Sequence, residues 1–308
     1  MLSEELKSAL SSIESKDVLF DEPMRKHTSF RIGGPADALI IPCGEGGLKH
    51  ALELAFQNSI PIAIIGAGTN LLVRDGGISG IVIKMVGCFD SVTISGRKVI
   101  AGAGCALSKL SRLAADRGLA GLEFAVGIPG TVGGAVVLNA GAHGAAIGDF
   151  VTTGKVMNFK GESAELTRDD LDFGYRKSEL QNKDVIVLSV TLELEKGNAE
   201  EIEEKMQEYL RQRSRKQPLN LPSAGSVFKN PKNDYAGRLI EACGCKGMSI
   251  GDAQMSELHA NFIVNKGNAT AQDVLQLMSK IRDTVLKKHG FELEPEIHIV
   301  GKGIEETR

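Results

Sequence analysis

The 308-residue sequence has no tryptophan, and aromatic residues make up only 5% of it. A stacking platform for single-stranded nucleic acid needs several exposed aromatic rings, so we do not expect one here. The chain also has no excess of positive charge, because 36 Lys and Arg residues are offset by 39 Asp and Glu residues. This balance argues against a chain-wide nucleic-acid footprint, and we predict no nucleic-acid partner.

Long apolar runs are missing as well. No stretch approaches the roughly 18 apolar residues that a membrane-spanning helix needs, so we predict no membrane insertion. The polar start of the chain contains no apolar core of a signal peptide. These absences predict a cytoplasmic protein.

Cysteine is scarce, with five residues at positions 43, 88, 105, 243 and 245. An odd number without regular spacing predicts no disulfide framework and favours a reducing compartment. The six histidines show no ligand spacing, and the Cys243-Gly-Cys245 motif has no partner pair. We therefore predict no metal site.

Glycine, in contrast, is abundant, with 36 residues, and a globular composition of 42% hydrophobic and 24% charged residues surrounds it. Strands and helices do not alternate as long βαβ units, so we predict an α+β fold with mixed or antiparallel sheets. The patterns predict an N-terminal helix at residues 1–20 and two α+β lobes at 21–86 and 87–200. A third domain follows at 201–294, and a last strand within 295–308 returns to the first lobe.

The first glycine-rich loop, at residues 66–71 (GAGTNL), directly follows a predicted strand. Its two glycines allow a sharp turn that brings backbone amides near an anion, and Thr69 and Asn70 add side-chain donors. Leu71 occupies the place of the third glycine in the dinucleotide fingerprint and no helix pattern follows, so that motif is excluded. A tight turn between two strands is the alternative interpretation.

A second and longer glycine-rich segment covers residues 127–144 and contains six glycines and Pro129. It lacks the Gly-Lys-Ser/Thr of a phosphate-binding Walker loop. A backbone of this kind suits close contact with a flat, extended ligand. The alternative is a glycine-rich crossover packed between two sheets.

Both loops, together with several shorter motifs, resemble the UDP-N-acetylenolpyruvoylglucosamine reductases. The matching stretches are 28–36 (TSFRIGGPA), 65–71, 127–134 (GIPGTVGG), 139–142 (NAGA), 175–178 (YRKS), 224–231 (AGSVFKNP) and 293–297 (LEPEI). The resemblance implies a two-lobed FAD-binding fold of the vanillyl-alcohol-oxidase (PCMH-like) type and a C-terminal substrate domain. It also implies reduction of enolpyruvyl-UDP-N-acetylglucosamine to UDP-N-acetylmuramate, with NADPH as hydride donor, in peptidoglycan precursor synthesis.

Two rival functions remain open at this point. One is another flavin oxidoreductase of the same fold with a different substrate. The other is a flavin- or nucleotide-binding regulator without catalysis. The motif at 175–178 is followed almost directly by a strand, so the chain resembles the shorter class of the family, which lacks an inserted tyrosine loop. The sequence does not determine the oligomeric state, and a monomer is compatible with it.

The resemblance assigns non-covalent FAD to the two glycine loops. The residues implied are Gly66, Ala67, Gly68, Thr69, Asn70, Leu71, Gly127, Ile128, Pro129, Gly130, Thr131, Gly133, Gly134, Ala140 and Gly141. The substrate contacts that we predict are Tyr175, Lys216, Lys229, Asn230, Arg238 and His259.

Three further residues are implied in catalysis. Arg176 can bind the substrate carboxylate through two parallel hydrogen bonds. Glu296 would share the charge that develops there, and Glu294 is a neighbouring alternative. Ser226 would supply the proton at carbon, with Lys229 as a candidate helper because a serine hydroxyl is a weak acid. A simple turn serine after Gly225 is the alternative for Ser226.

Overall fold

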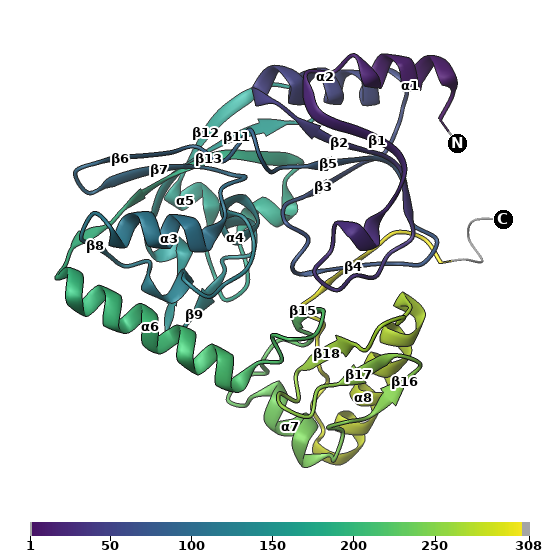
Figure 1. Cartoon of the computed structure of the whole chain (residues 1–308), viewed down its shortest axis with the longest axis vertical. Helices are drawn as coiled ribbons and strands as arrows, with labels where there is room; N and C mark the ends of the chain where they lie inside the picture. Colours follow the sequence, from purple (N-terminus) through teal and green to yellow (C-terminus); the bar gives the residue numbers. More distant parts are fainter. Residues whose placement is uncertain (1, 304–308) are drawn as a thin grey trace. The chain divides into compact units, whose positions relative to one another are not determined.

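The computed structural model describes residues 2–303, and these form two compact units, each assembled from separate stretches of the chain. Unit 1 comprises the chain up to Phe20, Ala38–Ala67 and Gly80–Gln212. Unit 2 comprises Asp21–Asp37, Gly68–Ser79 and the chain from Arg213 on. Both units combine helices and strands, so the predicted mixture of α and β structure is confirmed (Figure 1).

The first sheet of unit 1 has the strand order β1-β2-β5-β3 and is covered by two helices, α1 and α2 (Figure 1). The elements are α1 (Glu4–Ser11), β1 (Ser15–Pro23), β2 (Pro35–Pro42), α2 (Gly44–Gln57), β3 (Ile62–Ile65) and β5 (Ile78–Lys84). Leu48 and Leu52 of α2 pack with Ile81 and Ile83 of β5 in one fully buried cluster. The spacing of four between the leucines places both on the face of α2 that meets the sheet.

The predicted N-terminal helix over residues 1–20 is too long. The helical spacing holds through Leu10, which is completely buried, but α1 ends at Ser11. Ser12 ends the helix, because its N–H and its hydroxyl both donate to the Ala9 carbonyl. Serine side chains compete for backbone hydrogen bonds in this way, and the chain then continues into strand β1.

The second sheet of unit 1 is antiparallel throughout, with the order β12-β11-β13-β7-β6. Its strands are β6 (Val92–Ser95), β7 (Lys98–Gly102), β11 (Val151–Asn158), β12 (Ser163–Thr167) and β13 (Val185–Glu193). The helices α3 (Leu107–Ala115), α4 (Val132–Val137) and α5 (Arg168–Leu171) share a buried core with this sheet. The long helix α6 (Ala199–Lys216) is held to this unit by the Arg112–Glu203 and Lys205–Glu123 ion pairs.

Short elements complete unit 1 and its connections. Two-residue strands pair as β8 (Leu119–Ala120) with β14 (Glu195–Lys196), and β9 (Gly141–Ala142) with β10 (Ala145–Ala146). The 3-10 helices of unit 1 are η2 (Glu123–Ala125), η3 (Ile147–Asp149) and η4 (Glu179–Asn182), whereas η1 (Met24–Lys26) belongs to unit 2.

A disulfide joins Cys43 and Cys88 of unit 1, with 5.1 Å between their Cα atoms. The sequence predicted no such pair. Its two cysteines are 45 positions apart in the sequence and follow β2 and β5, which are neighbours in the first sheet.

Unit 2 is built on a four-stranded antiparallel sheet with the order β15-β18-β17-β16. Its strands are β15 (Ser223–Ser226), β16 (Ser249–Ile250), β17 (Ala253–Met255) and β18 (Phe262–Asn265), and its helices are α7 (Ala236–Ala242) and α8 (Ala271–His289). Figure 1 shows α8 packed along this sheet. Phe30 and Leu72 lie in the same buried core, so the two earlier segments of the chain are part of this unit.

The last predicted strand is shorter than expected. Within the predicted range 295–308, the structure has a strand only at β19 (His298–Val300), and residues 304–308 lie outside the described part. This strand pairs in parallel with β4 (Leu71–Val73). Pro295 lacks a backbone N–H and forms only an isolated bridge with Phe228, which delays the start of the strand.

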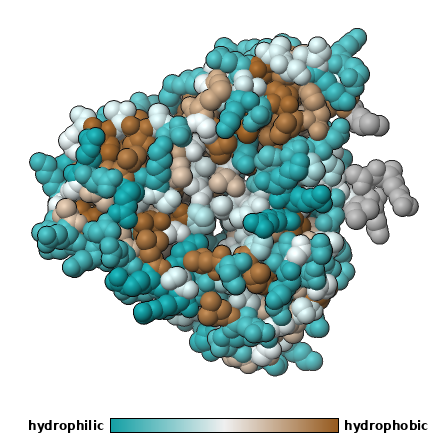
Figure 2. Space-filling model, in the orientation of Figure 1, coloured by the Kyte–Doolittle hydropathy of each residue, from teal (hydrophilic) through white to brown (hydrophobic). Residues whose placement is uncertain are grey.

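The surface in Figure 2 shows hydrophobic residues in several separate patches between hydrophilic ones. Large exposed hydrophobic side chains include Phe56, Tyr175, Tyr235 and Leu258. Among residues 2–303, no helix has the length and apolar character needed to cross a membrane.

The start of α8 gives a test of unit 2. Both oxygens of Asp75 accept hydrogen bonds from the first helical amides, Ala271 N–H at 2.8 Å and Gln272 N–H at 2.9 Å. We predict that Asp75→Ala lowers the free energy of unfolding by about 2 kcal/mol, because two amides lose a charged acceptor. Urea denaturation followed by circular dichroism measures this. Glu292→Ala removes only an exposed pair with Arg282 and should change stability by less than about 0.5 kcal/mol; equal losses would contradict the prediction.

Candidate functional site

The two glycine-rich loops meet in unit 1. Gly66 directly follows β3, and a Cβ atom added there would lie 2.4 Å from Thr131 Oγ1. Thr131 belongs to the second loop and is only 5% exposed, so it has little room to move away. Only glycine therefore fits at position 66 against the second loop.

The second loop is held tightly to its surroundings. Gly130 has φ +134°, a conformation that residues with a side chain rarely adopt. Gly133 donates its N–H to the Ala103 carbonyl at 2.8 Å, and a Cβ on Gly133 would lie 2.9 Å from the Ala103 Cβ. Thr131 begins α4 and accepts the Gly134 N–H through its hydroxyl. Gly130 is thus required by its backbone conformation, and Gly133 is required by close packing against Ala103.

The loops leave their backbone accessible while the side chains beneath are buried. Gly66, Ala67 and Gly130 are half-buried and Gly134 is exposed, whereas Val132 is buried. A surface of bare backbone suits a dinucleotide cofactor, whose pyrophosphate accepts hydrogen bonds from peptide amides. The residues present therefore fit the FAD that the sequence predicts. Of the other predicted loop residues, Gly127 and Ile128 are half-buried and Pro129 is exposed.

The rest of the first loop belongs to unit 2. Gly68 has φ +69°, and a Cβ on it would lie 2.2 Å from the His27 carbonyl oxygen. Its own carbonyl accepts the Ser29 N–H at 3.0 Å. Thr69 is half-buried, and Leu71 is buried as the first residue of β4.

Arg176 lies in a tight turn of unit 1 beside the second glycine-rich segment. It has φ +54°, a left-handed conformation that is strained for arginine, and an isolated bridge joins Gly174 to Lys177 around it. Its Nη1 donates to the Gly141 carbonyl at 3.0 Å, and its guanidinium lies over the Tyr175 ring, 5.6 Å from the centroid. The structure thus brings Arg176, Tyr175 and Gly141 together.

Two residues to which the sequence analysis gave no role support this turn. Asn139 is buried, donates to the Gly174 carbonyl at 2.8 Å and accepts the Gly148 N–H at 3.0 Å. Ser178 is fully buried and donates to the Val137 carbonyl at 2.7 Å. Asn139 is the first residue of the NAGA motif and Ser178 is the last residue of the YRKS motif. These positions were the sequence signal that could have identified them. Ala140, between Asn139 and Gly141, is half-buried.

Ser226 and Glu296 lie on neighbouring segments of unit 2. Ser226 is the last residue of β15, and Glu296 donates its N–H to the carbonyl of the next residue, Val227, at 2.8 Å. Asn70 Nδ2 donates to the Glu296 carbonyl at 3.0 Å. The structure therefore brings two of the three predicted catalytic residues together with the end of the first glycine loop.

The neighbouring carboxylate, Glu294, is placed differently. Its side chain is 73% exposed and pairs with Lys229 Nζ at 3.3 Å. Glu296 is half-buried. The difference in burial favours Glu296 over Glu294 as the residue of the site, and it gives Lys229 a surface partner.

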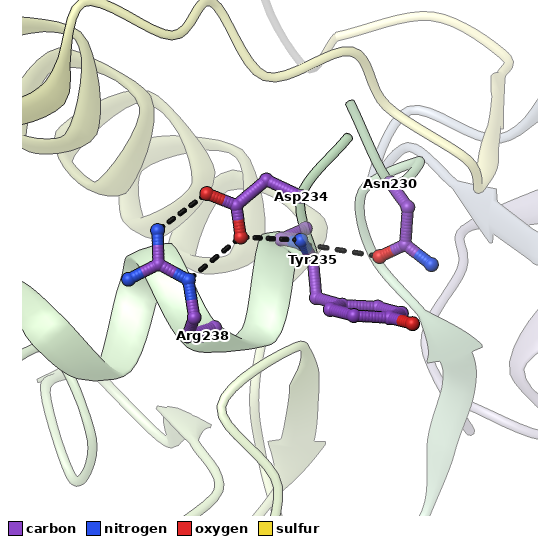
Figure 3. Close-up of polar contacts among 5 residues, drawn as sticks. Asn230, Asp234, Tyr235 and Arg238 are labelled. Carbon is purple, nitrogen blue, oxygen red and sulfur yellow. Dashed lines mark hydrogen bonds and ion pairs between the residues drawn. The ribbon is translucent and has the colours of Figure 1, made fainter. Parts of the chain in front are cut away.

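Figure 3 shows that two predicted substrate contacts also have structural roles at the start of α7. Asn230 Oδ1 accepts the Ala236 N–H at 3.1 Å. Arg238 binds Asp234 through two hydrogen bonds, and Asp234 also accepts the Tyr235 N–H at 2.7 Å. The Arg238 guanidinium and this N–H lower the pKa of Asp234 to about 2. The Asp234 carboxylate therefore holds Arg238 in place over the physiological pH range.

The remaining predicted contacts differ in exposure. Lys216 ends α6 and is exposed. His259 is half-buried and edge-on to the Phe262 ring, and burial lowers the pKa of its imidazole. Tyr235, which is not among the predicted contacts, is 69% exposed beside Asn230 (Figure 3). Within residues 2–303, no three His, Cys, Asp or Glu side chains group as metal ligands.

Comparison with known proteins gives consistent results for both parts of the chain. A family of FAD binding domains matches residues 36–167, and the C-terminal domain of UDP-N-acetylenolpyruvoylglucosamine reductase matches residues 217–300. The reductase of Alkaliphilus oremlandii is 49% identical over 96% of this chain and 97% of its own length. That of Clostridioides difficile is 45% identical over 95% of this chain and 96% of its own.

A solved structure agrees with these relatives. The UDP-N-acetylenolpyruvylglucosamine reductase of Thermus caldophilus superposes with a TM-score of 0.80 at 38% identity, covering 92% of this chain and 98% of that one. The predicted α+β fold of vanillyl-alcohol-oxidase type with an FAD-binding domain is confirmed. With full-length relatives well above 30% identity, the chain belongs to the UDP-N-acetylenolpyruvoylglucosamine reductase family.

Proposed function

We propose that this chain reduces enolpyruvyl-UDP-N-acetylglucosamine to UDP-N-acetylmuramate with NADPH, the activity predicted from its motifs. The observation that carries the proposal is the hydrogen bond from Glu296 N–H to the Val227 carbonyl, which joins the segment of Glu296 to the segment that follows Ser226. We place the reaction in the cytoplasm, the compartment of NADPH and nucleotide-sugar metabolism.

The two glycine loops would hold FAD. Bare backbone at Gly66, Ala67 and Gly130 would approach the pyrophosphate, and Thr131 would keep the two loops in contact. Bound there, FAD would supply the hydride-transfer chemistry that links NADPH to the methylene carbon of the enolpyruvyl group.

Arg176 and Glu296 would act on the substrate carboxylate. Charge grows on this group during the reduction, and a guanidinium that is held in one orientation stabilises it without further reorganisation. The hydrogen bond to Gly141 and the contact with the Tyr175 ring hold Arg176 in this way. Glu296 would share a proton with the developing charge on the substrate carboxylate.

Ser226 would give its hydroxyl proton to the carbon next to the reduced one. Serine is a weak acid, so the resulting alkoxide needs stabilisation. Lys229 lies three residues further along, but its ammonium pairs with Glu294 at 3.3 Å. A helper role for Lys229 would require this surface pair to open.

The UDP-sugar would be held by exposed and half-buried side chains. We retain Tyr175, Lys216, Lys229, Asn230, Arg238 and His259 as its proposed contacts. Asp234 fixes the Arg238 guanidinium at the start of α7, which would lower the entropy cost of binding a phosphate there.

Ser226→Ala tests the proton donor and the overall reaction. The wild-type flavin should be bleached by NADPH and return to yellow when the enolpyruvyl substrate is added. In Ser226→Ala, bleaching should continue at the wild-type rate while substrate-dependent reoxidation falls by about 10²-fold, because only that step needs the proton. Stopped-flow absorbance separates the two steps. Ser223→Ala, on the same strand, is the matched control, and equal slowing of both steps in Ser226→Ala would refute the assignment.

Glycine substitutions test the cofactor loops. Gly66→Val and Gly130→Val should lower the FAD content of the purified protein at least about tenfold, because a side chain meets Thr131 in one case and forbids the backbone conformation in the other. Absorbance at the flavin band against protein concentration measures this. Gly46→Ala, where nothing lies within 4 Å of the added Cβ, should keep its FAD. Full occupancy in both valine variants would remove these loops from the cofactor site.

Arg176→Lys tests carboxylate recognition. Lysine keeps the charge but cannot form two parallel hydrogen bonds, so substrate-dependent reoxidation should slow at least about tenfold while flavin reduction is preserved. Lys177→Arg changes the neighbouring residue, which pairs with Asp172 on the surface, and should leave both steps unchanged. A loss of FAD from Arg176→Lys would instead show that this arginine supports the cofactor.

A further inference from the structure

Cys43 and Cys88 differ from the other cysteines of the chain. They form the disulfide of unit 1, in which Cys43 is half-buried and Cys88 is exposed. Cys105, Cys243 and Cys245 are free and buried. A thiol or a disulfide in solution can therefore reach the Cys43–Cys88 pair, whereas the other three sulfurs are shielded.

Each cysteine is fixed at a junction of the first sheet. Cys43 follows β2 and directly precedes α2, and its N–H donates to the Glu14 carbonyl at 2.9 Å. Cys88 lies in the turn after β5, which the Asp90 N–H closes on the Gly87 carbonyl at 3.1 Å. The bond thus ties this turn to the start of α2.

The turn that carries Cys88 is packed directly on backbone. The Phe89 carbonyl accepts the Gly104 N–H at 2.9 Å and lies 2.2 Å from where a Cβ on Gly102 would be. The Ser91 carbonyl accepts the Gly102 N–H at 2.8 Å. Because no side chain separates the two segments, a shift of the turn is passed directly to residues 102–104.

The same residues hold the second glycine loop on their other side. The Ala103 carbonyl accepts the Gly133 N–H at 2.8 Å, and the Cys105 carbonyl accepts the Val132 N–H at 2.8 Å. The Gly130 carbonyl accepts the Leu107 N–H at 3.0 Å. A continuous series of backbone contacts therefore runs from the disulfide to the loop at 127–134.

We propose that Cys43 and Cys88 form a reversible redox modification site for low-molecular-weight disulfides and thiols, and that the closed bond strengthens the hold of the 127–134 loop on FAD. The coupling rests on the proposed role of this loop in FAD binding. The redox modification of the two cysteines does not depend on that role. In a reducing compartment, a disulfide that opens and closes in this way is a sensor rather than a permanent brace.

The chemistry is thiol–disulfide exchange. The exposed Cys88, as thiolate, attacks a small disulfide such as oxidised glutathione, forms a mixed disulfide and expels one thiolate. Cys43, deprotonated in turn, attacks the Cys88 sulfur and expels the second. The two cysteines lose two electrons and two protons overall, and the small disulfide is reduced to two thiols. An excess of small thiol reverses both steps.

Wild-type holoprotein equilibrated with oxidised or reduced glutathione tests both parts. Alkylation and peptide mass analysis should find Cys43 joined to Cys88 only in the oxidised sample. Oxidised protein should release FAD about fivefold more slowly on dilution, followed by the rise of free flavin fluorescence, as expected at the lower end of allosteric coupling. Its Tm should be higher by about 5 °C, because the bond restricts the unfolded chain.

The double variant Cys43→Ser/Cys88→Ser is the matched control and should release FAD at the reduced rate in both buffers. Alkylation of both cysteines after oxidation would overturn the modification site. If the disulfide forms but the rate of FAD release does not change, the coupling is overturned. The coupling is also overturned if oxidation slows FAD release from the double variant as much as from the wild type. A separate measurement shows whether the 127–134 loop binds FAD at all. If it does not, Gly130→Val keeps its FAD whether the two cysteines are oxidised or reduced.

Discussion

The parallel pairing of β4 with β19 is the constraint on which unit 2 depends. Residues 71–73 and 298–300 come from distant parts of the chain, and their pairing continues through the His298 N–H to the Asn70 carbonyl and from the Asn70 side chain to Glu296. These bonds set the position of Glu296 along Val227 and hence next to Ser226. The chemistry proposed for Ser226 thus relies on backbone hydrogen bonds made by a loop more than 150 positions earlier in the numbering.

A second constraint is the absence of a side chain at glycines that lie directly against a neighbouring segment. Gly66 against Thr131, Gly68 against His27 and Gly133 against Ala103 all leave less space than a Cβ atom needs. The excess of glycine visible in the composition therefore has a local cause at each of these positions. It lets two loops pack closely and still present peptide amides on the outside, which is what a pyrophosphate requires.

The sequence predicted best where the signal is local. Thr270 and Asp273 form a capping box at the start of α8, and Gly290 ends that helix in a left-handed conformation; the residue types at these positions are enough to indicate both ends. The Asp234–Arg238 pair was not predicted, because Asp234 precedes α7 and its side chain meets Arg238 only once the start of that helix has formed. The end of α1 at Ser11 was missed because the apolar spacing continues to Ile13, past the serines that end the helix.

Contacts between distant segments could not be predicted from the sequence. The Cys43–Cys88 bond, the hydrogen bonds of Asn139 that support the turn at Arg176, and the contact of Asn70 with Glu296 all depend on sheet order. For the candidate site, motif resemblance supplied Arg176, Ser226 and Glu296. The structure added the adjacency of the last two and the surface pairing that separates Glu294 from Glu296.

The interleaved make-up of unit 2 has a consequence for biosynthesis. Residues 21–37 and 68–79 leave the ribosome early, yet most of the core around Phe30 and Leu72 comes from the C-terminal part of the chain. At about 5–20 residues per second, Leu72 waits roughly 10 to 45 seconds for β19 to be made. During that interval the nascent chain exposes an apolar segment that has no sheet to join. Chaperone binding to the growing polypeptide is therefore expected to concentrate there and to end only when translation does.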